Sequence, residues 1–217
     1  MLWASERRAI LGVVVAAFLS PPAEARAQGL GDGTYGRIAG DVTLVGALGG
    51  VVAARGPRAE AELRLRYLES VGAFVSYEDG ALLGSAAEPE RVLTAGVEAR
   101  PLFFYRWLRG REGSAAWLDL AVDSLGLELG ATFTQPAGTA FASLGGLQLG
   151  LGVELPLWPR STGPWIGLHG GLRWSDAVLE SGVIRSADDR EAFLVITVAW
   201  HQTVVAHVVD VGDRAPR

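Results

Sequence analysis

The sequence predicts an all-β protein, an antiparallel up-and-down transmembrane β-barrel of eight strands, with ten as the alternative count, after a cleaved signal peptide. Three observations lead to this fold class. Apolar and polar residues alternate over long stretches, tryptophans lie near the ends of these stretches, and an export leader opens the chain. Closure by its own strands also suits an exported chain of 217 residues without cysteine, which can form no disulfide bond.

Composition excludes several classes of protein. Acidic residues outnumber basic ones by 24 to 19, which is unfavourable for binding nucleic acid. Hydrophobic residues make up 49% of the chain, too many for intrinsic disorder. Because cysteine is absent and no metal or cofactor motif is found, we expect neither a metal nor a cofactor.

The first 27 residues have the three parts of a secretory signal peptide. Arg7 and Arg8 form a basic start, Ala9–Leu19 is an apolar run, and Ala25-Arg26-Ala27 offers a cleavage site. The apolar run is shorter than the roughly 20 residues that a membrane helix needs. The expected parts are a signal peptide at 1–27 and an outer-membrane barrel domain at 28–217, with strands within about 34–204 and a C-terminal tail at 205–217.

Beyond the leader, apolar residues recur at every second position, which is the period of a β-strand with one apolar face. In Arg58–Leu68, alanine, leucine and tyrosine alternate with arginine and glutamate. Most such stretches reach the roughly ten residues of a tilted strand that crosses a bilayer, whereas globular strands average about five or six. The stretches lie at 36–54, 59–78, 90–103, 115–133, 143–157, 164–175 and 190–204.

These stretches are odd in number, whereas bacterial barrels have an even number of strands. We expect the eighth strand from a break near Glu69-Ser70, where polar residues interrupt the second stretch. In 115–133 the phase of the apolar residues changes, which predicts a β-bulge near Asp123-Ser124. The segment Pro101–Gly110 fits a short interfacial helix and an aromatic strand end equally well.

Tryptophans near strand ends are typical of the aromatic girdles of barrels in a bilayer. Trp165 and Trp174, for example, lie near opposite ends of one predicted strand. Alternatively, the tryptophans cap a globular core. The expected girdle comprises Trp107, Trp117, Trp158, Trp165, Trp174 and Trp200.

With these features the sequence resembles the small outer-membrane β-barrel proteins of Gram-negative bacteria. The resemblance is architectural and rests on the signal end, the ELRLRYL and FLVITVAWH alternations, the GGLQLGLGVELPLW stretch and the tryptophans. It implies an outer-membrane location, a monomer, membrane lipids and the barrel-assembly machinery as partners, and no nucleic acid. The chain departs from such proteins because Trp200, the candidate aromatic of the last strand, is followed by a tail to Arg217.

In a membrane barrel the polar face of each strand lines the lumen. Eight strands leave an interior just wide enough for side chains to fill. Buried charges are costly unless they are paired, so the mixed signs on these faces predict cross-strand ion pairs. The expected network comprises Arg37, Asp41, Glu60, Glu62, Arg64, Arg66, Glu98, Arg100, Glu154 and Arg173.

A polar, side-chain-filled lumen favours a structural or surface-interaction role over an enzyme. The outer loops Asp79–Glu90 and Ser175–Arg190 are the candidate contact sites, because variable loops commonly carry such contacts. An open pore is disfavoured, since porins use about 16 or more strands.

Two other functions remain as alternatives. One is an outer-membrane lipid-modifying hydrolase in which His169 and His201 act with Asp119 or Asp123, although no G-x-S-x-G or H-E-x-x-H motif is present. The other is a soluble lipocalin-like periplasmic barrel that binds an apolar ligand. In that barrel the apolar strand faces would point inward, whereas in a membrane barrel they point to lipid.

Overall fold

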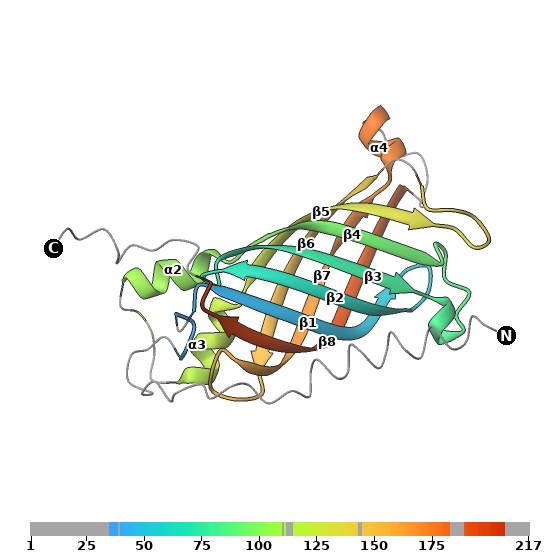
Figure 1. Cartoon of the computed structure of the whole chain (residues 1–217). Helices are drawn as coiled ribbons and strands as arrows, with labels where there is room; N and C mark the ends of the chain where they lie inside the picture. Colours follow the sequence, from blue (N-terminus) through green and yellow to red (C-terminus); the bar gives the residue numbers. More distant parts are fainter. Residues whose placement is uncertain are drawn as a thin grey trace. The chain divides into compact units, whose positions relative to one another are not determined.

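Eight strands form a closed antiparallel barrel in which each strand pairs with its neighbours in the chain and β8 pairs with β1 (Figure 1). This computed structural model describes residues 35–38, 40–109, 111, 115–142, 145–182 and 189–206, so the expected signal peptide and most of the expected tail lie outside the described residues. The strands are β1 (Val42–Ala53), β2 (Arg58–Tyr67), β3 (Val71–Asp79), β4 (Arg91–Ala99), β5 (Gly126–Gln135), β6 (Gly146–Pro156), β7 (Gly163–Trp174) and β8 (Arg190–Val204). The helices of the described part are the 3-10 helix η1 (Ala81–Leu83) and the α-helices α2 (Pro101–Leu108), α3 (Ala116–Asp123) and α4 (Asp176–Ser181).

The count of eight strands is confirmed, including the break in the second stretch. Leu68 and Glu69 are the two central residues of the turn between β2 and β3, which is closed by a hydrogen bond from the Ser70 N–H to the Tyr67 carbonyl at 3.1 Å. The segment that begins at Pro101, which fitted a helix and a strand end equally well, forms helix α2. The fixed φ of Pro101 and its missing N–H suit the first helical position.

The expected β-bulge near Asp123-Ser124 is wrong. Residues Ala116–Asp123 form helix α3, and β5 begins only at Gly126. The change of apolar phase in this stretch therefore marks the junction between a helix and a strand. Trp117, which was expected in the girdle near a strand end, lies in the first turn of α3.

The two ends of the barrel differ (Figure 1). One end, here called the helical end, carries α2, α3, the β2–β3 turn and the connection 157–162. The start of β1 and the end of β8 also lie there, because Val42 pairs with Val204. The opposite end, here called the loop end, is where β1 connects to β2, β3 to β4, β5 to β6 and β7 to β8.

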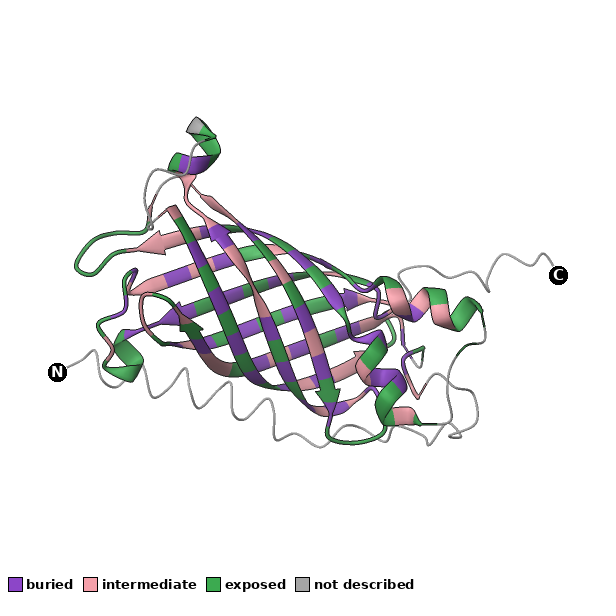
Figure 2. Cartoon of the chain, turned by 180° about the vertical axis from the view of Figure 1, so that it is seen from behind, coloured by how far each residue is buried: buried purple, intermediate pink, exposed green. Residues whose placement is uncertain are grey.

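Buried and exposed residues alternate along the strands (Figure 2). The exposed positions are mainly leucine, valine, isoleucine and alanine, and the buried positions are mostly polar or glycine. The barrel and helices lie within a single compact unit, Gly31–Arg217. Among the described residues, no helix is both long and apolar enough to cross a membrane.

Candidate functional site

Inward-facing side chains divide the barrel interior into two walls. Strands β8 and β1 supply an apolar wall that includes Val45, Val51, Phe193 and Val195. Strands β2 to β7 supply most of the charged wall. Its buried charged residues are Arg58, Glu60, Glu62, Arg64, Arg66, Glu78, Glu98, Glu128, Glu154 and Arg173, and Glu191 of β8 joins them.

Arg58 organises the charged wall near the loop end. Its Nε donates to Glu78 at 2.8 Å and its Nη2 donates to Glu191 at 2.9 Å. Arg173 of β7 also donates to Glu78, and its Nε donates to Gln148 at 2.7 Å. The hydrogen bonds of these two guanidinium groups therefore join β2 to β3, β6, β7 and β8. The fixed fork geometry of a guanidinium group favours such multiple contacts.

Arg64 occupies the middle of the wall. It binds both carboxylate oxygens of Glu62, at 2.5 and 2.6 Å, and its Nη1 donates to Glu98 and to Glu128 at 2.6 Å each. The carboxylate of Glu128 also lies 2.8 Å from His169 Nδ1. A single arginine thus neutralises acidic groups from three strands, β2, β4 and β5.

Glu154 gathers the charges nearest the helical end. Its carboxylate accepts from Arg66 Nη2 at 2.8 Å and from Arg100 Nη2 at 2.5 Å. Arg66 also pairs with Glu98, which links this group to the Arg64 group. The Nε2 atom of His201 lies 3.5 Å from Glu154, and the His201 ring stacks on Trp165 with their centroids 4.5 Å apart.

Helices α2 and α3 close the helical end of the barrel. Phe103 and Leu120 are buried beneath them, and Leu120 packs with Val45 and Trp165. Asp123 of α3 accepts from Arg37 and, at 2.7 Å, from Arg106 of α2. Partial burial opposes the charge of Arg106, but the carboxylates of Asp119 and Asp123 raise its pKa above the usual value, so this link stays charged.

Nine of the ten residues expected in the lumen network are buried in the barrel or at its helical end. Arg37 lies at that end, with Asp123, rather than among the strands. Asp41 differs from the expectation: it is only half-buried, and its carboxylate accepts from the backbone N–H of Ala206 at 2.6 Å. Glu60 is buried, but its Oε2 has no hydrogen-bond partner.

Sequence reasoning missed four members of the wall, namely Arg58, Glu78, Glu128 and Glu191. Each continues the polar phase of a recognised alternation. These residues could have been found by extending the alternation of polar residues to the ends of the strands. In the stretch 115–133 this extension needed the correct start of β5 at Gly126.

The structure does not assemble the hydrolytic site. His169 and His201 both point inward from adjacent strands and are only 4% and 1% exposed, so both side chains lie inside the barrel. Asp119 and Asp123 lie in α3 and pair with Arg106 and Arg37 instead. Within the described part of the chain, no group of three or more His, Asp or Glu side chains is arranged to hold a metal ion.

The expected girdle tryptophans separate into three groups. Trp158 and Trp200 lie near the helical end and pack edge to face with centroids 5.8 Å apart, and Trp107 and Trp117 are exposed on the helices of that end. Trp174 lies alone among them at the loop end of β7. Trp165 differs from the expected girdle, because it is 3% exposed and its indole N–H donates inward to the Ser161 carbonyl at 2.9 Å.

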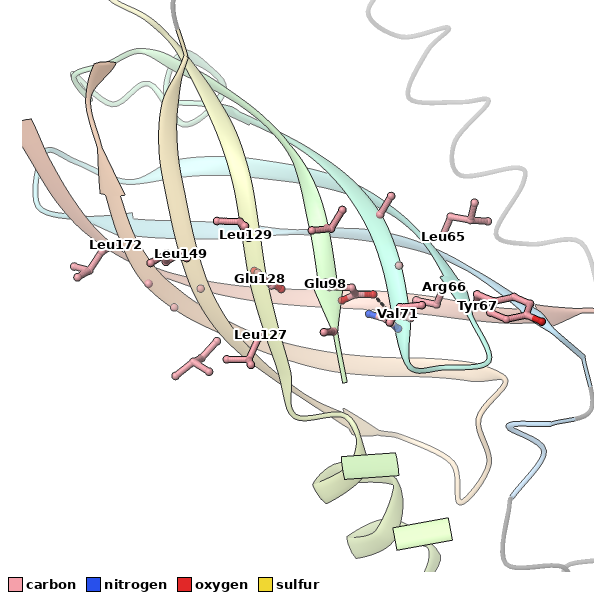
Figure 3. Close-up of a pocket in the computed structure, with 18 of the residues that line it drawn as sticks. Leu65, Arg66, Tyr67, Val71, Glu98, Leu127, Glu128, Leu129, Leu149 and Leu172 are labelled. Atoms are coloured by element: carbon pink, nitrogen blue, oxygen red, sulfur yellow. Dashed lines mark hydrogen bonds and ion pairs between the residues drawn. The ribbon is translucent and has the colours of Figure 1, made fainter. Parts of the chain in front are cut away.

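The outer face of the barrel carries an apolar groove of about 1090 Å³ that crosses β2 to β7 (Figure 3). Its lining includes Leu65, Leu127, Leu129 and Leu149, which are each about half exposed. Charged residues of the same strands, such as Glu128, have their side chains buried inside the barrel. The apolar strand faces are therefore outside, which is the reverse of a lipocalin-like arrangement.

Fold and interior together define a small closed β-barrel with an apolar outer face and an ion-paired interior. No protein-family model matches the sequence, and no curated protein matches it. Among solved structures, the chain is similar to Ail, the attachment invasion locus protein of Yersinia pestis, in complex with the heparin analogue sucrose octasulfate. The match covers 74% of this chain and 96% of Ail, with a TM-score of 0.32 and 12% identity. Values this low support no argument about function, and the fold rests on its own strand pairing.

Proposed function

We propose that this protein is an integral β-barrel of the bacterial outer membrane, with a structural role and with its loop end available for surface interactions. The observation that carries this proposal is the uncharged belt of outward-facing residues. Between the strand ends these residues are apolar, and the outward-register charges Asp79, Arg91 and Arg190 all lie at the loop end. Soluble monomers rarely expose apolar patches larger than a few hundred Å².

Strand length agrees with a membrane location. The eight strands have 9 to 15 residues each, and a tilted strand needs about 9 to 11 to cross a bilayer. Exposed aliphatic residues such as Leu63 and Val198, 70% and 62% exposed, would contact lipid rather than water. This belt stabilises the protein only in an apolar surrounding.

The distribution of connections supports an orientation. Barrels of the outer membrane have short turns on the periplasmic side and longer loops outside. Three of the four connections at the loop end have ten or more residues. At the helical end the β2–β3 turn and the connection 157–162 are short, and the long connection between β4 and β5 is the one that folds into α2 and α3. The β1 start and the β8 end also lie at the helical end. We therefore place the loop end outside the cell and the helical end in the periplasm.

Membrane fractionation of cells that express the full chain tests the proposal. We expect the protein in the outer-membrane fraction, with a band that migrates faster on gels before boiling than after. Recovery in the aqueous periplasmic fraction would contradict a membrane barrel. In planar bilayers we expect no steady conductance, because ion pairs and Arg–aromatic contacts fill the interior.

A further inference from the structure

Two exposed arginines lie over aromatic rings at the helical end. The guanidinium carbon of Arg109 is 5.6 Å from the centroid of the Tyr105 ring, and that of Arg160 is 4.6 Å from the Trp158 ring. Both arginines and both aromatic side chains are exposed. Arginine on an aromatic ring is held by a cation–π interaction and keeps its N–H donors free for an anion.

The helices of this end also expose an apolar surface. Tyr105, Leu108, Trp117, Leu118 and Val122 are between 37% and 74% exposed. The helices follow the belt of the barrel closely in the chain, because α2 begins two residues after Ala99 of β4 and α3 ends three residues before Gly126 of β5.

The exposed surface is held in place rather than loosely attached. Arg106 joins α2 to α3 through Asp119 and Asp123, and Phe103 and Leu120 anchor the helices in the barrel. These contacts occupy the inward faces of α2 and α3. The aromatic and aliphatic side chains on the outward faces of the two helices stay exposed in the described part of the chain.

Charge at the two ends points to the kind of partner. In the described part of the helical end, Arg109, Arg111 and Arg160 are exposed, whereas the acidic residues are buried or, like Asp41, engage the backbone. At the loop end, exposed acidic residues such as Glu88 and Glu180 accompany the exposed Arg190. The helical end thus combines exposed arginines with aromatic rings and aliphatic residues, next to a lipid-facing belt. Such a surface complements the headgroup region of an anionic leaflet.

We infer that the helical end binds anionic phospholipid, with Arg109 and Arg160 contacting headgroup phosphates and the exposed side chains of α2 and α3 entering the acyl boundary. The inference depends on the proposed function, since it requires the barrel to span a bilayer. An arginine near an anionic membrane surface strengthens binding about fivefold. The lipid neighbours of the protein should therefore be enriched in the anionic species.

The test measures energy transfer from tryptophan to dansyl-labelled lipid in vesicles that contain the refolded full chain. In phosphatidylcholine vesicles with a small fraction of phosphatidylglycerol, we expect at least threefold more transfer to labelled phosphatidylglycerol than to labelled phosphatidylcholine. The double variant R109Q/R160Q should lose most of this preference. The matched control R55Q/R190Q removes two arginines from the loop end and should keep it.

The outcomes separate the two proposals. Equal transfer to both lipids, with the fast-migrating folded band present, overturns phospholipid selectivity and leaves the barrel intact. Equal loss in R109Q/R160Q and R55Q/R190Q shows that selectivity follows net charge, which overturns the assigned site. If the unaltered chain gives no folded band in any vesicle, the membrane barrel itself is contradicted.

Discussion

Arg64 is the side chain on which the charged wall depends most, because it neutralises Glu62, Glu98 and Glu128. We expect Arg64→Met to lower the free energy of unfolding by about 3–5 kcal/mol, since removing one partner leaves uncompensated buried charges. The loss can be measured by urea unfolding in vesicles, followed by the mobility of the folded band. Arg190→Met at the exposed loop end should change stability by less than about 0.5 kcal/mol. Equal urea midpoints for Arg64→Met and Arg190→Met would show that the stability of the barrel does not depend on Arg64.

Glu60 is the member of the wall whose removal should help. Glu60 lies opposite Glu78 of β3 in the strand pairing, and Glu62 lies two positions further along β2. The Oε2 atom of Glu60 has no hydrogen-bond partner. We expect Glu60→Gln to raise the urea midpoint, because a buried carboxylate beside other carboxylates costs free energy. Glu98→Gln, which weakens pairs with Arg64 and Arg66, should lower it. The prediction fails if the two glutamine variants shift the midpoint in the same direction.

The inward position of most charged residues was predictable from alternation alone, because a period of two assigns every second side chain to one face. Which charges pair was not, since Arg64 reaches Glu128 across a sequence separation of 64 residues. The apolar wall of β8 and β1 was also missed as a feature. Phe193 and Val195 share the phase of His201, but a single strand does not reveal what lies opposite it.

The β2–β3 turn contains a strained local conformation. Leu68 and Glu69 both have left-handed backbone angles, with φ of 47° and 54°. Turns whose two central residues are left-handed favour asparagine or glycine there, because other side chains cost about 1–2 kcal/mol in that conformation. We expect Leu68→Asn to stabilise the protein by about 0.5–1 kcal/mol in urea unfolding.

The same substitution on a strand provides the control for the turn. Leu65 is 51% exposed on the outer face of β2, where an amide would meet lipid without a hydrogen-bond partner. Leu65→Asn should therefore destabilise the barrel. A stability loss for Leu68→Asn as well would indicate that Leu68 makes packing contacts worth more than the backbone strain.

Helix α3 shows where sequence patterns fail. Leu118, Leu120 and Val122 follow a period of two, and a short apolar run of this kind fits a strand or a helix. The spacing of four between Asp119 and Asp123 was the helical signal, because residues four apart share one face of a helix. Both aspartates bind Arg106 of α2, a tertiary contact that no local pattern contains.

Closure of the barrel pairs the first strand, β1, with the last strand, β8. The count of eight strands followed from the breaks and the even-number rule, but the register between β1 and β8 depends on residues about 150 positions apart, such as Gly49 and Thr197. Small residues permit that register. A Cβ added at Gly49 would lie 2.1 Å from the Ile196 carbonyl oxygen, whereas at Gly50 the nearest atom is 3.9 Å away.

Substitution of these adjacent glycines therefore tests the closed barrel. We expect Gly49→Ala to lose most of the fast-migrating folded band after refolding into vesicles, because β1 and β8 must separate or shift to relieve a clash with the backbone. Gly50→Ala changes the same chemistry one position along, where the added methyl group is accommodated on the outer face, and should fold like the unaltered chain. Both variants have the same composition, so a difference between them reports on geometry alone. If Gly49→Ala folds as well as Gly50→Ala, then β1 and β8 do not pair in this register, and closure must occur through a different alignment of the two strands.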